Sequence, residues 1–277
     1  MAQKQTEKVY INVDDYSLAS YFVNVMRDDI ELSKGTCFFA KVNKKLYLVT
    51  NWHIVSGRNA DTNICLSNTC AIPNKLRVYL PRIIENKGVK YDPHVYLEIP
   101  LYDKDDNKRW LEKKVNGRTI DVALIPCGDI RDDLFYLPIE EAEEPFNEGV
   151  ECFIASEIYI IGFPFGNDYG YIPIWKRASV ASEPESDIEG LPYFFADTAT
   201  KEGMSGSPVI LYKDRAIKIM DKEKGNSYHK TKFVGVYSGR IGANADVRND
   251  AQLGRVWKAK VIQEIIDENI KENESTL

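Results

Sequence analysis

Three residues with nucleophilic or titratable side chains stand beside apolar segments of the chain. His53 follows an apolar strand end in LYLVTNWHIVSG, Asp121 opens the apolar segment DVALIPC, and Ser205 lies between two glycines in EGMSGSPVI. A serine hydroxyl is a weak nucleophile that needs an imidazole to accept its proton and a carboxylate to orient that imidazole. Together the three residue types indicate acyl transfer with Ser205 as the nucleophile.

Each segment taken alone also has a structural explanation. A histidine after a strand is most often a structural residue, and a buried carboxylate such as Asp121 is satisfied equally well by a backbone cap. The glycines beside Ser205 suit an ordinary turn, although they also let backbone N–H groups lie beside the hydroxyl as an oxyanion hole requires. The order His, Asp, Ser on a β-rich chain is more specific than any single segment.

The elements that must position these residues are mostly strands. Short runs rich in β-branched and aromatic residues alternate with turn formers, which is typical of an all-β barrel or sandwich. The expected strands span 36–42, 45–50, 76–80, 94–102, 119–126, 150–155, 158–164, 172–182, 191–197, 207–212 and 232–238. Asn43 and Lys44, between the first two, predict a tight antiparallel hairpin.

The chain is expected to form a single domain with two halves. The charged segment 131–149 predicts a connector between a first half at about 30–130 and a second at 150–250, in which KEKGNS (222–227) is an exposed turn. From Leu253 onward, apolar residues recur at helical spacing and predict an amphipathic helix over 252–273 that packs on the core. A second short helix is expected at 18–26.

Composition excludes several classes of function. The chain has 277 residues, a net charge of −6 and no apolar stretch long enough to cross a bilayer, so we expect neither nucleic-acid nor membrane binding. The start lacks the apolar core of a secretion signal, which favours the cytoplasm. Five irregularly spaced cysteines and three histidines, none paired at helical spacing, predict reduced thiols with no metal site and no cofactor: Cys37, Cys65, Cys70, Cys127, Cys152, His53, His94 and His229.

The motifs resemble those of the trypsin-like (chymotrypsin-fold) serine peptidases, and within them the cytosolic and Deg-type bacterial branch. VTNWHIV is similar to that branch's Thr-Asn-x-His-Val-Val, DVALI to its Asp-Ile-Ala-Leu, and GMSGSP to its Gly-Asn-Ser-Gly-Gly-Pro. Further agreement comes from GTCFF, IIGFPFG and ASVAS, and from Asp197 at an acidic position that is structural in the family. The resemblance extends from about Gly35 to Gly239, which is most of the chain.

This resemblance implies two antiparallel six-stranded β-barrels with the site in the cleft between them and a C-terminal α-helix on the second barrel. It implies that Ser205 attacks a peptide carbonyl, that His53 acts as base and then acid, and that Asp121 orients His53. The N–H groups of Gly203 and Ser205 would bind the oxyanion. The resemblance assigns substrate binding to four residues, Ala199, Tyr237, Ser238 and Gly239.

The sequence departs from the family at several positions. Met204 replaces the aspartate that zymogen-activated members use, so we expect no activation by a new amino terminus. Ile54 replaces a cysteine of secreted members, and Ala199 replaces the pocket aspartate of trypsin, so we expect no strong preference for Arg or Lys. The chain ends at Leu277, and we therefore expect no appended peptide-binding (PDZ) domain.

Two functions remain open from the sequence. The first is an active serine endopeptidase acting on protein or peptide substrates, held in check until an activating partner or trigger orders the segment around Gly203. The second is a catalytically idle module that binds extended peptides by strand addition near Tyr237. The presence of all three residues of the expected triad favours the enzyme.

Overall fold

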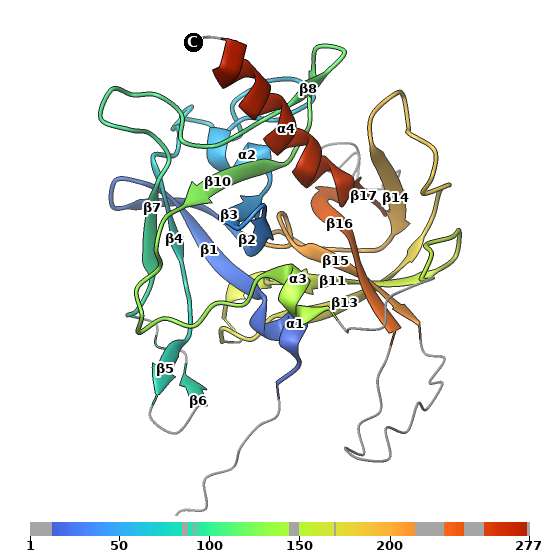
Figure 1. The fold of residues 1–277 in the computed structure, drawn as a ribbon, viewed down its shortest axis with the longest axis horizontal. Helices are drawn as coiled ribbons and strands as arrows, with labels where there is room; N and C mark the ends of the chain where they lie inside the picture. The colour runs from blue at the N-terminus through green and yellow to red at the C-terminus, as the bar shows by residue number, and fades with distance from the viewer. Residues whose placement is uncertain are drawn as a thin grey trace, which may run out of the picture.

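Two six-stranded antiparallel sheets, one from each half of the chain, dominate the computed structural model (Figure 1). The structure describes residues 13–84, 88–90, 92, 94–143, 150–168, 170–213, 230–240 and 252–275. In spatial order the first sheet contains β10 (Ala123–Cys127), β3 (Lys45–Thr50), β2 (Ile30–Val42), β1 (Ser20–Arg27), β4 (Lys75–Val78) and β7 (Leu97–Pro100). The second contains β11 (Glu157–Gly162), β13 (Ile174–Val180), β14 (Tyr193–Asp197), β17 (Leu253–Lys258), β16 (Lys230–Arg240) and β15 (Pro208–Lys213).

The all-β prediction with a C-terminal helix is confirmed, but only the second sheet closes into a barrel. The first sheet is curled and open, since its edge strands β7 and β10 form no ladder with each other in the described residues. The chain from 101 to 122 runs between these edges and contributes isolated bridges, such as Leu111 with Leu124, in place of a full strand. Short strands lie outside the two sheets: β5 (Arg82–Ile84), β6 (Gly88–Lys90), β8 (Lys114–Val115), β9 (Arg118–Thr119) and β12 (Pro164–Asn167).

The hairpin predicted at Asn43 and Lys44 is confirmed. β2 and β3 pair up to Val42 and Lys45, and the two residues between them have φ values of 50° and 64°. Two consecutive residues with positive φ match the twist of a two-residue β-hairpin. This hairpin matters for the site because β3 leads directly into the segment that carries His53.

The helix expected at 18–26 is wrong. Helix α1 (Asp15–Leu18) is a single turn whose Tyr16 N–H is capped by the side chain of Asp14, and β1 begins at Ser20. β1 pairs with β2 on one side and β4 on the other, and seven of its eight residues are buried or partly buried. A continuous apolar run of this kind does not distinguish a strand from a buried helix by its periodicity.

The helix expected over 252–273 begins later in the structure. Residues Leu253–Lys258 form β17, which pairs with β14 and β16 and so closes the second barrel. Helix α4 then runs over Lys260–Ser275. The expected strand at 150–155 is also absent, because that described segment is irregular and Ala155 has a φ of 62°. The expected turn at 222–227 lies outside the described residues.

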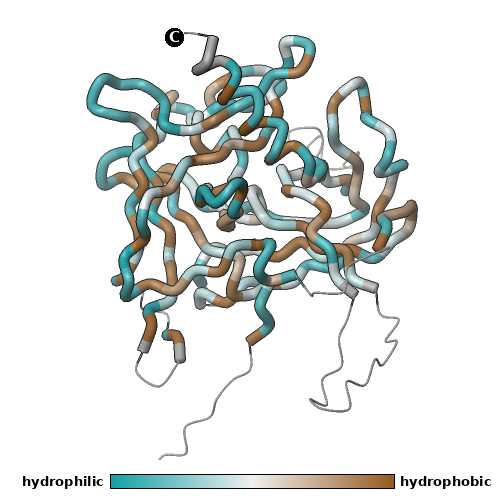
Figure 2. The backbone as a smooth tube through the Cα atoms, in the orientation of Figure 1, coloured by the Kyte–Doolittle hydropathy of each residue, from teal (hydrophilic) through white to brown (hydrophobic). Residues whose placement is uncertain are grey.

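The main core lies between the two sheets and is covered by α4. Its apolar side chains come from the first sheet, from the second barrel and from Val261, Ile262, Ile265 and Ile266 of the helix. Helix α4 also contacts the first half, since Asn269 donates a hydrogen bond to the carbonyl of Glu112. Figure 2 shows hydrophobic residues along the inner strands and hydrophilic residues in outer loops. The helix therefore packs over both halves and not only over the second barrel.

Candidate active site

His53 and Asp121 are held together by three neighbouring elements. His53 lies in helix α2 (Trp52–Ser56), which follows β3, and Asp121 precedes β10, which pairs with β3. The ring Nδ1 of His53 is 2.7 Å from Asp121 Oδ2, and the His53 N–H donates to Asp121 Oδ1 at 2.8 Å. Asn51 donates its side-chain amide to the Asp121 carbonyl at 2.7 Å. Because the carboxylate accepts from Nδ1, the ring nitrogen Nε2 is left as the base.

Ser205 lies in a tight turn immediately before β15. Gly203 and Gly206 on either side have φ values of 93° and 86°, a region that L side chains rarely adopt. A Cβ on Gly206 would lie 2.0 Å from the carbonyl oxygen of Thr36, and one on Gly203 would lie 2.1 Å from that of Phe163. Both glycines are therefore required by close backbone approach as well as by φ.

Thr36 on β2 connects the serine turn to the first sheet. Its N–H donates to the Ser205 carbonyl at 2.8 Å, and its hydroxyl donates to the Gly203 carbonyl at 2.7 Å. The same hydroxyl accepts the N–H of Phe163, and the Thr36 carbonyl accepts the hydroxyl of Thr50. The segment GTCFF resembles the family, but its sequence indicates no role for Thr36. A buried threonine in a strand has many structural uses, so its type alone gave no signal.

A cleft of about 1070 Å³ brings the candidate residues together. His53, Asp121, Gly203 and Ser205 all line it. Among the described residues, His53 Nε2 and the Ser205 hydroxyl have no hydrogen-bond partner, and neither do the N–H groups of Gly203 and Ser205. The residues that line the cleft therefore include a base, a hydroxyl and two N–H donors that make no hydrogen bond within the described part of the chain.

The electrostatic environment of His53 favours its protonated form. Burial lowers the pKa of His53, but the charge of Asp121 and its hydrogen bond together raise it by more, so the pKa lies above its usual value of 6.5. The imidazole side chain is 20% exposed and the Asp121 side chain is 7% exposed. A largely desolvated ion pair of this kind stabilises an imidazolium.

Buried thiols in the first half are poor nucleophiles. Burial raises the pKa of Cys127 to about 11 and raises that of Cys37 well above its usual range. Since the thiolate is the reactive form, neither competes with Ser205 at neutral pH. The Cys70 thiol hydrogen-bonds to Cys65, and this bond favours the protonated thiol and raises its pKa. In the described part of the chain, no group of three or more His, Cys, Asp or Glu side chains is arranged to hold a metal ion.

The residues expected to bind substrate do not all reach the cleft. Ser238 and Gly239 line it, whereas Ala199 is exposed outside it and Tyr237 is fully buried behind it. Thr200 lines the cleft next to Ala199, and its hydroxyl hydrogen-bonds to that of Tyr237. Thr200 therefore forms this part of the cleft wall, and the buried Tyr237 holds Thr200 from behind through the hydrogen bond between their hydroxyls.

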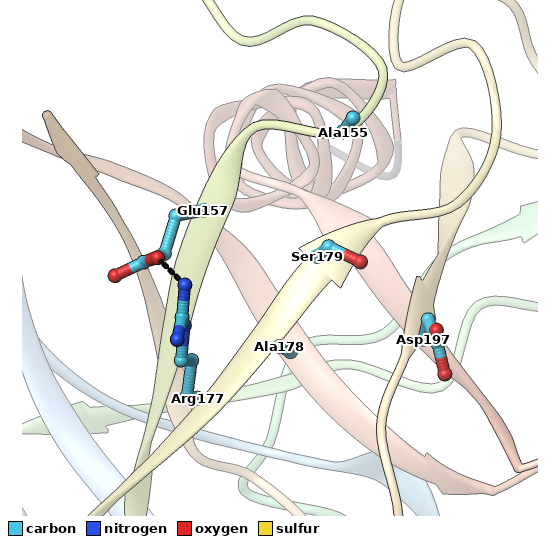
Figure 3. A pocket seen from close by; sticks show the side chains of 6 residues that line it. All are labelled: Ala155, Glu157, Arg177, Ala178, Ser179 and Asp197. Carbon is cyan, nitrogen blue, oxygen red and sulfur yellow. Dashed lines mark hydrogen bonds and ion pairs between the residues drawn. The ribbon is translucent and has the colours of Figure 1, made fainter.

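A second hollow, of about 280 Å³, lies on the surface of the second barrel and contains none of the candidate triad (Figure 3). Glu157 on β11 and Arg177 on β13 form an ion pair there. The hollow is lined by Ala155, Glu157, Arg177, Ala178, Ser179 and Asp197. The charges of Glu157 and Arg177 are paired with each other in this hollow. Because Arg177 lies outside the cleft that contains Ser205, it is a suitable control position for charge substitutions.

The sequence of residues 35–217 matches the profile of the trypsin-like peptidase domain. The chain belongs to the trypsin-like peptidase family. The matched segment contains His53, Asp121 and Ser205, the three positions at which this trypsin-like peptidase domain presents its candidate triad. The family acts on proteins, and the barrel, the curled sheet and the C-terminal helix form a chymotrypsin-like fold.

One solved structure is distantly similar to the chain. The solved structure of the serine endoprotease from Yersinia pestis is similar to this trypsin-like peptidase domain with 11% sequence identity and a TM-score of 0.48. The match covers 96% of this chain and 69% of that chain. No curated protein sequence matches the chain. None of the helices in the described residues is long and apolar enough to span a membrane.

Proposed function

We propose that this protein is a serine endopeptidase that hydrolyses peptide bonds through His53, Asp121 and Ser205. One observation carries the proposal: Asp121 holds the His53 ring at 2.7 Å on the wall of a cleft that Ser205 also lines. Nδ1 is thereby occupied and Nε2 is left for a proton from the serine hydroxyl. The family supports the reaction class, and this geometry supports the choice of residues.

In the first half-reaction, the Ser205 hydroxyl oxygen attacks the carbonyl carbon of the substrate peptide bond. His53 Nε2 takes the hydroxyl proton, and Asp121 stabilises the resulting imidazolium. When the tetrahedral intermediate collapses, the C–N bond breaks and His53 returns the proton to the leaving amine. Water then attacks the Ser205 ester, again with His53 as the base, and releases the carboxylic acid.

The oxyanion of each tetrahedral intermediate would be bound by the N–H groups of Gly203 and Ser205. Neither group has a protein acceptor among the described residues, which supports this role. One such donor contributes about 3 kcal/mol to the transition state. The hydrogen bonds from Thr36 to the carbonyls of Gly203 and Ser205 hold the same turn from the opposite side.

Fluorophosphonate labelling tests the proposal, because this reagent reacts only with an activated serine. We expect covalent labelling of the wild type, measured by intact mass, and none of Ser205→Ala. His53→Ala should still fold, as judged by circular dichroism, and label far more slowly. A folded wild type that stays unlabelled both in purified form and in lysate of its native host would contradict the proposal.

A further inference from the structure

Arg255 connects the closing strand of the second barrel to the loop that follows His53. From β17 its Nη1 lies 3.1 and 3.2 Å from the two carboxylate oxygens of Asp61, and its Nη2 lies 3.2 Å from one of them. The side chain of Asn59 accepts the N–H of Asp61 at 2.9 Å and so shapes the turn that presents the carboxylate. Two segments 194 positions apart in sequence thus meet through one guanidinium.

The guanidinium of Arg255 lies beside two aromatic rings and is largely out of water. Its central carbon lies 4.7 Å from the ring centre of Tyr193 and 5.6 Å from that of Trp257. The Arg255 side chain is only 14% exposed, and its buried Nε has no hydrogen-bond partner in the described part of the chain. A planar, preoriented and partly desolvated guanidinium is well suited to bind a carboxylate.

Arg255 also lines the cleft that contains Ser205. β16 and β17 pair at Tyr237 with Val256 and at Arg240 with Gly254, so the two residues between, Ser238 and Gly239, stand opposite Arg255. Trp257 donates its indole N–H to the Ser238 hydroxyl at 3.1 Å and fixes this segment. An extended peptide that lies along Ser238 and Gly239 therefore passes beside the Arg255 guanidinium.

The other cationic side chains that line the cleft are less suited to this role. Lys34 is 37% exposed and lies 3.9 Å from Glu31, and Lys201 is exposed. Flexible, hydrated ammonium groups discriminate weakly between carboxylate and amide. Asp61 is 46% exposed, so solvent weakens its hold on Arg255 and a substrate carboxylate can compete with it.

We propose that Arg255 is a specificity-determining residue that selects peptides carrying Asp or Glu within the four residues preceding the cleaved bond. This inference rests on the proposed peptidase function. In the free protein, the Asp61 carboxylate binds the Arg255 guanidinium, and the acidic side chain of the substrate replaces it there. Asp61 therefore competes with the substrate for Arg255, and it also connects the His53 loop to β17.

Matched peptides test the inference. Four pairs would differ only by Glu or Gln at one of the four positions before the cleaved bond, with cleavage followed by mass spectrometry for the wild type, Arg255→Gln, Asp61→Asn and the control Arg177→Gln. For at least one pair, kcat/KM should favour Glu by roughly tenfold. Arg255→Gln should abolish the preference, Asp61→Asn should increase it, and Arg177→Gln should leave it unchanged.

Parallel fluorophosphonate labelling separates failure of specificity from failure of the peptidase function. Labelling and cleavage with no Glu preference in the wild type or in Asp61→Asn would overturn the inference and leave the peptidase function intact. If neither labelling nor cleavage is detected, the affinity of Ser205→Ala for the same peptides is measured by fluorescence anisotropy. Tighter binding of the Glu peptides that is lost on adding Arg255→Gln supports the inference. Equal binding of the Glu and Gln peptides overturns it. If Arg255→Gln fails to fold, the comparison of Asp61→Asn with the wild type gives the same decision.

Discussion

Thr36 and Ser205 are joined by a backbone hydrogen bond of 2.8 Å that crosses from the first sheet to the second barrel. The Thr36 hydroxyl makes a second connection, to the Gly203 carbonyl at 2.7 Å, and also accepts the Phe163 N–H. Thr36 itself is fully buried. The serine turn is therefore held in part by a residue from the other half of the molecule.

Thr36→Val should destabilise both the fold and the serine turn. Valine keeps the shape of threonine but leaves the Gly203 carbonyl and the Phe163 N–H without their buried partner, at a cost of about 1–3 kcal/mol. Urea unfolding measures the loss, and the fluorophosphonate labelling rate should fall with it. Thr36→Ser retains the hydroxyl and should stay closer to the wild type. Unchanged labelling and stability in Thr36→Val would show that the hydroxyl does not position the turn.

Asp121→Asn should fold normally and lose activity by about 10⁴. The asparagine side chain cannot hold the His53 ring in the tautomer that leaves Nε2 as a base. The labelling rate and peptide hydrolysis measure the loss, with circular dichroism as the test of folding. Asp129→Asn, which removes an exposed carboxylate outside the cleft, serves as the control. Near-normal turnover in Asp121→Asn would remove Asp121 from the mechanism.

Activity should rise with pH through a midpoint above 6.5, because only neutral His53 accepts the serine proton and its pKa is raised in the fold. The effect on stability has the opposite sign. A raised pKa means that the folded protein binds the proton more tightly, so this contribution is complete below pH 6.5 and is lost as pH rises through the folded pKa. Labelling rates and urea unfolding measured across this pH range check both effects. A labelling midpoint below 6.5 would contradict the assignment of His53 as the base.

Met204→Asp should severely destabilise the second barrel. Met204 is fully buried in a cluster with Val209, Tyr237 and Val256. A carboxylate in that apolar cluster would cost at least about 3 kcal/mol unless it found a partner. Met204→Leu, which conserves volume, should cost under about 1.5 kcal/mol. Thermal and urea unfolding distinguish the two variants, and equal stability would show that the aspartate is accommodated.

Strands were predictable from the sequence where they were bounded by turn residues. The hairpin at Asn43 and Lys44 is an example, because the two residues leave the β2 and β3 patterns intact on both sides. The sequence of β17 predicts the start of a helix because Val256 and Trp257 are both apolar and both buried, one inside the barrel and the other under α4. Burial on both faces removes the alternation by which a strand is recognised.

For the site, the sequence predicted the reactive side chains that lie in one cleft, but it did not predict the residues that hydrogen-bond to their loops and hold them in position. His53 and Asp121 meet as expected, and Ser205 shares their cleft, because each stands in a distinctive local motif. Thr36 and Arg255 act through partners that are distant in sequence, and threonine and arginine are common residues in strands. Such roles depend on tertiary contacts, which local patterns do not encode.

The place of β17 in the chain order has a consequence for synthesis on the ribosome. This strand closes the barrel, yet it emerges after every other strand of either sheet and long after Ser205. Until Leu253–Lys258 is made, β14 and β16 expose unpaired edges that cannot hold the barrel shut. An interrupted nascent chain therefore lacks the wall that faces Ser238 and Gly239 across the bulge between β16 and β17.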